Sequence, residues 1–179
     1  MNVLLTISRL IDALNNSVGK LAYWLILVAV LVSAGNATIR FTLDTSSNAW
    51  LELQWYLYSA VFLLCAGYTL LRNEHIRIDI VVSRFSIRTQ AWIDVFGTIF
   101  FFFPAVILIL VLSWPMFISS YNIGEMSSNA GGLLRWPVKL LVPVGFFLLM
   151  LQGFSELIKR IAFLMGLIAE PGEKMHSSH

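Results

Sequence analysis

Four long apolar stretches, separated by shorter polar segments, constrain the fold of this chain more than any other feature. No charged residue occurs from Leu21 to Ile39, and none occurs from Val95 to Gly124. An α-helix needs about 20 predominantly apolar residues to cross the hydrocarbon core of a bilayer. We therefore predict four transmembrane helices, at about residues 21–41, 50–71, 90–113 and 137–161.

The composition leads to the same fold class. Hydrophobic residues make up 58% of the chain and charged residues 12%, whereas a soluble domain carries about 25% charged residues. The mean hydropathy is +0.80. We predict one all-α integral membrane domain over residues 1–179. The net charge of +2 comes without a basic patch interleaved with exposed aromatic residues, so no nucleic-acid partner is indicated.

Residues 1–20 are amphipathic. The apolar side carries Val3, Leu4, Ile7, Leu10, Ile11, Leu14 and Val18, and the polar side carries Asn2, Arg9, Asp12, Asn15 and Asn16. This pattern predicts an interfacial helix that lies on the membrane surface. A cleaved signal peptide is the alternative, because small residues at 33–37 follow the first apolar core. The region before that core is too long and too amphipathic for a signal peptide.

A charged segment, residues 73–89, separates the second and third spans. Its first part alternates isoleucine with charged residues, which indicates extended backbone. Asp79 is then placed to cap a short helix. In that helix Arg84 and Arg88 share the side opposite the apolar residues, as in a helix that lies flat among lipid headgroups. We predict a hinge followed by an interfacial arm.

The cations determine the expected orientation. Nine of the twelve Lys and Arg residues fall on the side of the predicted membrane that holds both termini and the hinge. They are Arg9, Lys20, Arg72, Arg77, Arg84, Arg88, Lys159, Arg160 and Lys174. Cation-rich loops of membrane proteins face the cytoplasm. We therefore expect both termini, including a tail at residues 162–179, to be cytoplasmic.

Charged residues near the span ends suggest two ion pairs. Arg40 and Glu52 flank a short loop, so we expect them to pair near the outer surface; the alternative is that Glu52 contacts a partner subunit. Asp94 lies one turn inside the third span. We expect it to pair with Arg88 or Arg72 rather than to act as a proton-relay group.

Other residues within the spans indicate helix packing. Asn36 is expected to hydrogen-bond to a neighbouring helix rather than to bind a substrate. Pro104 should kink the third span, since it lacks a backbone donor and crowds the preceding turn. Pro137 is at an early position of the fourth span, where the missing donor costs little. Pro143 and Gly145 suggest a distortion further along that span.

Several chemistries are excluded by what the sequence lacks. Cys65 is the single cysteine, so neither an internal disulfide nor a paired-thiol oxidase is indicated. His75, His176 and His179 lie outside the apolar stretches, which argues against a haem between the helices. No zinc or phosphate-binding motif occurs, and no carboxylate lies mid-span as in a small exporter. The residues predict no cofactor, no metal and no enzyme, but a membrane scaffold or a subunit of a larger partner.

The hinge sequence Glu74-His75-Ile76-Arg77-Ile78-Asp79 resembles the Glu-His-Val-Arg-Val-Asp signature of one transporter family. That family is the small membrane subunit, DctQ-type, of tripartite ATP-independent periplasmic (TRAP) transporters. The resemblance extends from about Glu52 to Arg160. The matching features are Glu52, Trp136-Pro137, Lys139, Pro143-Val144-Gly145-Phe146, Leu151-Gln152-Gly153 and Glu156.

The resemblance implies a function. The chain would be the small permease subunit in a bacterial inner membrane, beside a large membrane subunit and a periplasmic substrate-binding protein. It would brace the large subunit, which carries the substrate and sodium sites, during uptake of an organic acid. The alternative is a stand-alone four-helix scaffold. The structural and interaction candidates are Arg40, Glu52, Glu74, His75, Arg77, Asp79, Arg84, Arg88, Trp136, Pro137, Lys139 and Gln152.

Overall fold

The computed structural model describes residues 2–44, 47–72 and 84–168. Its helices are α1 (Asn2–Leu43), α2 (Asn48–Leu71), α4 (Ile87–Gly97), the π-helical turn η1 (Thr98–Phe102), α5 (Phe103–Asn122) and α6 (Trp136–Leu164). Four helical stretches in these ranges are long and apolar enough to cross a membrane, which confirms the predicted all-α membrane fold. Four predicted site residues, Glu74, His75, Arg77 and Asp79, lie outside the described residues.

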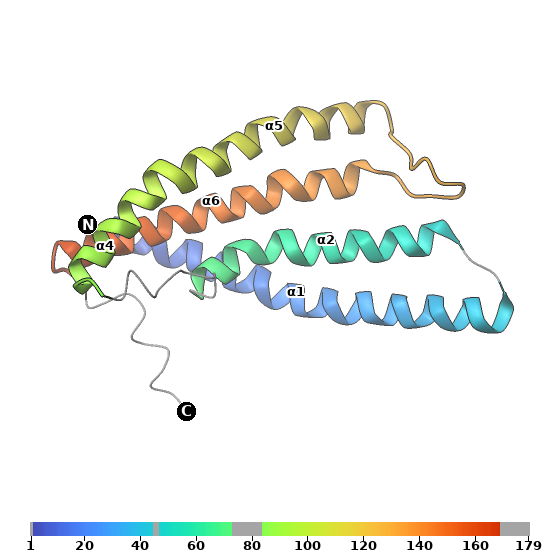
Figure 1. The fold of residues 1–179 in the computed structure, drawn as a ribbon, viewed down its shortest axis with the longest axis horizontal. Coiled ribbons are helices and arrows are strands. Elements are labelled where there is room, and N and C mark those ends of the chain that lie inside the picture. The colour runs from blue at the N-terminus through green and yellow to red at the C-terminus, as the bar shows by residue number, and fades with distance from the viewer. Residues whose placement is uncertain (1, 45–46, 73–83, 169–179) are drawn as a thin grey trace.

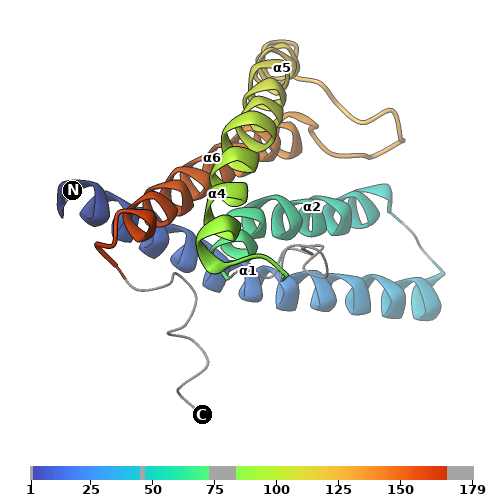
Figure 2. The same cartoon turned by 60° about the vertical axis from the view of Figure 1, so that its left-hand side comes forward.

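The helices form two antiparallel pairs, with α6 in the centre. In Figure 1, α6 lies between α5 on one side and α2 on the other, and it contacts α1, α2, α4 and α5. Figure 2 shows α5 leaning away from the α1–α2 pair. The α1–α2 connection and the loop between α5 and α6 are at the same end of the bundle, which we call the loop end (Figure 1).

The prediction of a distinct surface helix at residues 1–20 is wrong, because α1 is one helix of 42 residues. At about 1.5 Å per residue its length is about 63 Å, roughly twice the hydrocarbon thickness. Part of its polar side is buried: Ser8 and Asn15 are 2% and 0% exposed, whereas Arg9 is exposed. Apolar residues such as Val3 and Leu10 are exposed instead. The amphipathic pattern therefore reflects packing of the polar side against a neighbouring helix.

The third span is longer than predicted and contains the expected distortion. Helices α4, η1 and α5 run on from Ile87 to Asn122, so the expected end near residue 113 is wrong. Pro115 lies within α5 without ending it, since a membrane helix tolerates a proline whose freed carbonyl is satisfied locally. The π turn directly precedes Pro104, and Phe103 N–H donates to Thr98 O, five residues back. This is the distortion that Pro104 predicts.

Two glycines allow α6 to contact its neighbours closely. A Cβ atom on Gly145 would lie 2.7 Å from the backbone oxygen of Leu63. A Cβ on Gly67 of α2 would lie 3.2 Å from the backbone oxygen of Leu148 on α6, and 2.2 Å from Asn15 Oδ1 on α1. Side chains at these positions would push the helices apart. Small residues at such crossings are the usual means of close helix packing in membranes.

The predicted arm helix over residues 79–88 is only partly within the described residues, and there it is wrong. Arg84 and Phe85 form a turn and a bend, and α4 begins at Ile87. Ser86 is the N-cap, and its hydroxyl accepts a hydrogen bond from Thr89 N–H at 3.3 Å. A serine hydroxyl accepts such a bond well, so the helix starts after Arg84 and places Arg88 in its first turn.

Candidate functional site

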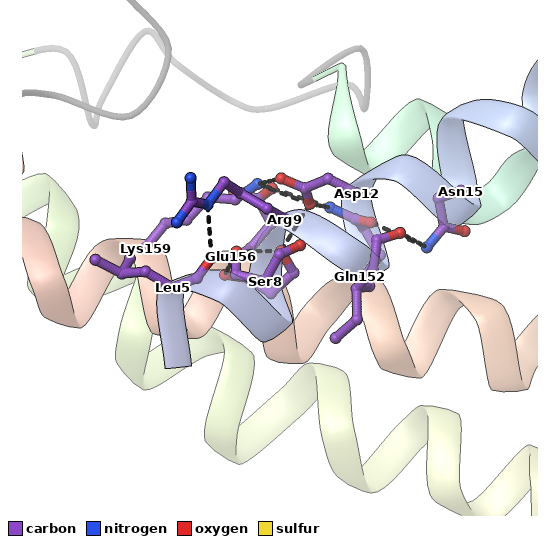
Figure 3. Close-up of polar contacts among 10 residues, drawn as sticks. Leu5, Ser8, Arg9, Asp12, Asn15, Gln152, Glu156 and Lys159 are labelled. Atoms are coloured by element: carbon purple, nitrogen blue, oxygen red, sulfur yellow. Dashed lines mark hydrogen bonds and ion pairs between the residues drawn. The ribbon is translucent and has the colours of Figure 1, made fainter. Parts of the chain in front are cut away.

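Polar side chains of α1 and α6 form a buried cluster at the end of the bundle opposite the loop end. We call it the α1–α6 cluster. It contains Ser8, Asp12 and Asn15 from α1 and Gln152, Ser155, Glu156 and Lys159 from α6 (Figure 3). Buried polar groups are costly unless each has a partner. The cluster supplies such partners across about 140 residues of sequence, although Asn15 Oδ1 has none among the described residues.

Gln152 is the centre of the α1–α6 cluster. It is 0% exposed. Its Nε2 donates to Asp12 Oδ1 at 2.9 Å and to Glu156 Oε1 at 3.2 Å. Its Oε1 accepts from Asn15 Nδ2 at 3.0 Å. Both ends of the amide are thereby satisfied, as Figure 3 shows, so the side chain acts as a polar cross-link between the two helices.

Asp12 gathers the remaining donors of the α1–α6 cluster. Lys159 Nζ lies 2.8 Å from Asp12 Oδ2 and 2.7 Å from Glu156 Oε1. Ser155 Oγ donates to Asp12 Oδ1 at 2.7 Å, and it lies 2.7 Å from Ser8 Oγ. Two carboxylates and one ammonium are thus held by direct contacts at the rim. The arrangement fastens the first half of α1 along α6.

Asp94 pairs with a different cation from those predicted. Its Oδ2 lies 3.2 Å from Arg160 NH2 on α6. Arg72 instead donates from Nε to the Tyr68 hydroxyl at 3.1 Å, and its guanidinium lies 5.2 Å from the Tyr68 ring centroid. The expected pairing with Arg88 or Arg72 is therefore wrong. Asp94 pairs with Arg160 because the close packing of α4 against α6 brings the Arg160 guanidinium to the carboxylate.

Glu52 marks the loop end, and its predicted pairing with Arg40 is also wrong. Glu52 is 4% exposed. Its oxygens accept hydrogen bonds from Asn129 Nδ2 at 2.9 Å and from Leu133 N–H at 2.7 Å, and Ser127 Oγ also donates to it. The loop between α5 and α6 folds over α2 and supplies these donors, whereas Arg40 is exposed. Glu52 therefore ties the start of α2 to that loop.

The same loop is fixed to α6 by a second carboxylate. Glu125 pairs with Lys139, and Arg135 NH2 donates to Ser127 Oγ at 3.3 Å. The hydrogen bond from Lys139 lowers the pKa of Glu125 below its ordinary value. The loop is also closed by a backbone bond from Arg135 N–H to Glu125 O at 2.8 Å.

The start of α6 has the predicted sequence signals. Helix α6 begins at Trp136, with Pro137 in its first turn. The Trp136 ring meets Tyr121 of α5 edge to face, with ring centroids 5.4 Å apart. Trp136, Pro137 and Lys139 thus belong to one contact region that joins α6 to the end of α5 and the loop.

Sequence reasoning placed Gln152 and Glu52 among the candidates but missed Ser8, Asp12 and Ser155. A signal for Ser8 and Asp12 was present in the sequence, because the polar residues of α1 recur at helical spacing. What the periodicity could not indicate is that α6 covers that side. In the part of the chain that the structure describes, no group of three or more His, Cys, Asp or Glu residues is placed to hold a metal ion. The hydrogen bonds and ion pairs of the two polar regions join different elements of the same chain, so these regions are structural connections.

Comparison with known proteins identifies the family. No curated protein and no solved structure shows significant similarity to the chain. Residues 29–163 match the family described as tripartite ATP-independent periplasmic transporters, DctQ component. The matched range includes Glu52, Gln152, the last part of α1 and helices α2, α4, α5 and nearly all of α6. The chain, a multi-pass membrane protein, therefore belongs to the DctQ family and is a small permease component of a TRAP transporter.

Proposed function

We propose that this chain braces the large membrane subunit of a TRAP transporter during sodium-driven uptake of an organic acid. A periplasmic binding protein would deliver the acid, and the complex would lie in the bacterial inner membrane. One observation carries the proposal: the buried polar side chains of the bundle, such as Gln152 and Glu52, contact other residues of the same chain. Groups of this kind would line a solute pathway in a transporter that works alone.

The geometry supports a bracing role. An elevator-type transporter moves one domain against another that must stay still. The α1–α6 cluster fastens the long α1 to the central helix, so that the two resist bending as one body. At the loop end, the Glu52 contacts fasten the start of α2 to the loop between α5 and α6. A rigid body of this shape would enlarge the footprint of the still domain and oppose its tilting.

The outer surfaces offer apolar area for the large subunit and for membrane lipids. Phe101, Leu108 and Leu112 of the third span are 71%, 58% and 65% exposed. Lipid tails and protein neighbours are equally apolar, so these residues suit either contact. We assign the large subunit to the apolar faces of the spans.

Copurification and reconstitution test the proposal. The chain is expressed with its large membrane subunit, purified through a tag on the chain, and reconstituted in liposomes with a sodium gradient and the binding protein. We expect copurification, uptake of a labelled organic acid only with both membrane subunits, and none with this chain alone. Solute movement by the chain alone would overturn the proposal. Purification without any large partner would favour the stand-alone scaffold.

The basic residues of the hinge provide a finer test. We propose that Arg77, Arg84 and Arg88 anchor the complex in the cytoplasmic leaflet, where anionic lipids attract such side chains. Arg84 and Arg88 are exposed. Replacing all three by glutamine should lower uptake in proteoliposomes that contain anionic lipid, without changing substrate capture by the binding protein. Unchanged uptake at equal expression would contradict the anchoring role.

A further inference from the structure

The loop end of the bundle carries a polar groove between α1 and α2 that the proposed function does not use. It has a volume of about 440 Å3, within the range of about 300–1,000 Å3 that is usual for ligand pockets. Its lining residues are Ser33, Asn36, Ala37, Arg40, Phe41, Asp44 and Gln54. Helix α1 supplies all of them except Asp44, which directly follows α1, and Gln54, which belongs to α2.

The polar groups of this groove lack partners of their own. Asn36 is 7% exposed, yet within the described residues its side chain makes no hydrogen bond. Arg40 and Asp44 have opposite charges and lie four residues apart at the end of α1, but in the same described ranges neither forms an ion pair. The Asn36 amide lines the groove, so a bound group can supply its missing hydrogen-bond partner. An arginine with five donors and a free carboxylate beside it form a ready binding site for a group that carries both charges.

The surroundings of the groove show where such a group would come from. Arg40 directly follows the charge-free run that ends at Ile39. Its neighbours Phe41 and Leu43 are 90% and 65% exposed. Exposed apolar side chains around a single cation are typical of a helix end at the level of the lipid headgroups, where arginine reaches phosphate. The opening of the groove therefore meets the membrane boundary rather than open water.

We propose that the α1–α2 groove binds the zwitterionic headgroup of a phospholipid of the phosphatidylethanolamine type. The Arg40 guanidinium holds the phosphate, and the Asp44 carboxylate accepts hydrogen bonds from the ammonium. The Asn36 amide hydrogen-bonds to the phosphate or to the ester oxygens beneath it. Ala37 and Phe41 contact the start of an acyl chain. A headgroup without the ammonium, such as phosphatidylglycerol, engages only the Arg40 and Asn36 part.

Native mass spectrometry of the full chain tests the site. The protein is purified in mild detergent, supplied with equal amounts of phosphatidylethanolamine and phosphatidylglycerol, and the retained lipids are counted. Arg40→Gln should lower retention of both lipids by about threefold or more, as expected for loss of roughly 0.7 kcal/mol or more. Asn36→Ala should also lower both. Asp44→Asn should lower only phosphatidylethanolamine and so change the ratio of the two lipids.

Lys20→Gln is the matched control, because Lys20 is an exposed cation of the same helix far from the groove. Its lipid retention should equal that of the unchanged chain. Equal retention by Arg40→Gln and Lys20→Gln, or an unchanged lipid ratio in Asp44→Asn, would overturn the proposal.

Two further experiments distinguish a bound lipid from a soluble anion and from a protein partner. Inorganic phosphate and glycerophosphoethanolamine, which have no acyl chains, should not displace the retained lipid. Displacement by either would assign the groove to a soluble anion and overturn the lipid proposal. Loss of the large membrane subunit from Arg40→Gln, with lipid retention unchanged, would assign the groove to a protein partner and would also overturn it.

Discussion

Gln152 and Glu52 show how single polar residues are accommodated in a chain this apolar. Each is almost completely buried, and each has several hydrogen-bond partners on other elements of the same chain. In the hydrocarbon core of a membrane no water is available to hydrogen-bond to an unpaired polar group. Side chains that bond to each other across helices therefore hold the helices in one arrangement. Their effect is on stability and geometry rather than on chemistry.

Gln152→Leu should destabilise the bundle. Leucine has similar volume but leaves Asn15 Nδ2 without its interhelical acceptor, and it removes the donor to Asp12 and Glu156. We expect a loss of about 1–3 kcal/mol in the free energy of unfolding, measured by denaturation in detergent. Gln90→Leu is the control, since among the described residues the Gln90 side chain donates to Phe85 O of the adjacent turn alone. Equal effects of the two changes would contradict the role given to Gln152.

The Glu125–Lys139 pair predicts a pH dependence of stability. The pKa of Glu125 is lowered, chiefly by the hydrogen bond from Lys139. A carboxylate with a lowered pKa in the folded state stabilises fully above its ordinary value of 4.5 and loses that contribution as the pH falls through the folded value. Thermal midpoints of the chain and of Lys139→Met should therefore differ at pH 6 and converge toward pH 3. A difference that is independent of pH would contradict the pairing.

At the scale of elements, α6 organises the fold. It contacts α1, α2, α4 and α5, and its polar residues meet α1 while its glycines meet α2 and η1. Gly153 lies against the Phe102 ring of the π turn, where an added Cβ would lie 2.3 Å from Phe102 Cε1. The distorted turn before Pro104 and the central helix thus fit each other. The arrangement of the bundle depends on glycines at two contacts along α6, Gly145 and Gly153.

Gly145→Ala should weaken the contact between α2 and α6. The new methyl would lie 2.7 Å from the backbone oxygen of Leu63, and backbone cannot move aside as a flexible side chain can. Overpacking of this kind costs about 1–3 kcal/mol, measured as the unfolding free energy in detergent. Gly35→Ala is the control, because a Cβ at Gly35 meets nothing within 4 Å. Its stability should be unchanged or slightly higher.

At the scale of the whole molecule, two polar regions secure the opposite ends of one apolar bundle. The α1–α6 cluster fixes one end, and the Glu52 and Glu125 contacts fix the loop end (Figure 1). The helical surface between them is largely apolar. This arrangement, two fastened ends with apolar faces between them, is what the proposed bracing role requires of a DctQ-family chain.

The expected orientation can be tested by labelling intact cells. Ser128 in the loop and Ser17 of α1 are both exposed and lie toward opposite ends of the chain's bundle. In a Cys65→Ser background, an impermeant maleimide should label Ser128→Cys on intact cells, because the cation-poor side faces outward. Ser17→Cys should react only after the cells are permeabilised. Labelling of Ser17→Cys on intact cells would reverse the predicted topology.

The sequence by itself determined the membrane class, the four spans, the start of α6 at Trp136-Pro137 and the family. These follow from the length of charge-free runs, from proline chemistry and from motifs, all of which are local along the chain. The ends of the spans were not all determined: the third span was expected to end near residue 113, but the helix continues past Pro115 to Asn122. Proline removes one backbone donor, and whether a helix continues past it depends on the surroundings.

Only the tertiary structure decided which residues are partners. Glu52 was expected to meet Arg40 nearby in sequence, but it bonds to Leu133 in a loop 81 residues away. Asp94 likewise pairs with Arg160. Polar residues of α1 contact α6, whereas the periodicity alone predicted that they would face water and lipid headgroups. Periodicity indicates that a helix has two different sides, but the element that covers each side depends on how the helices cross, and that is set by contacts distant in sequence.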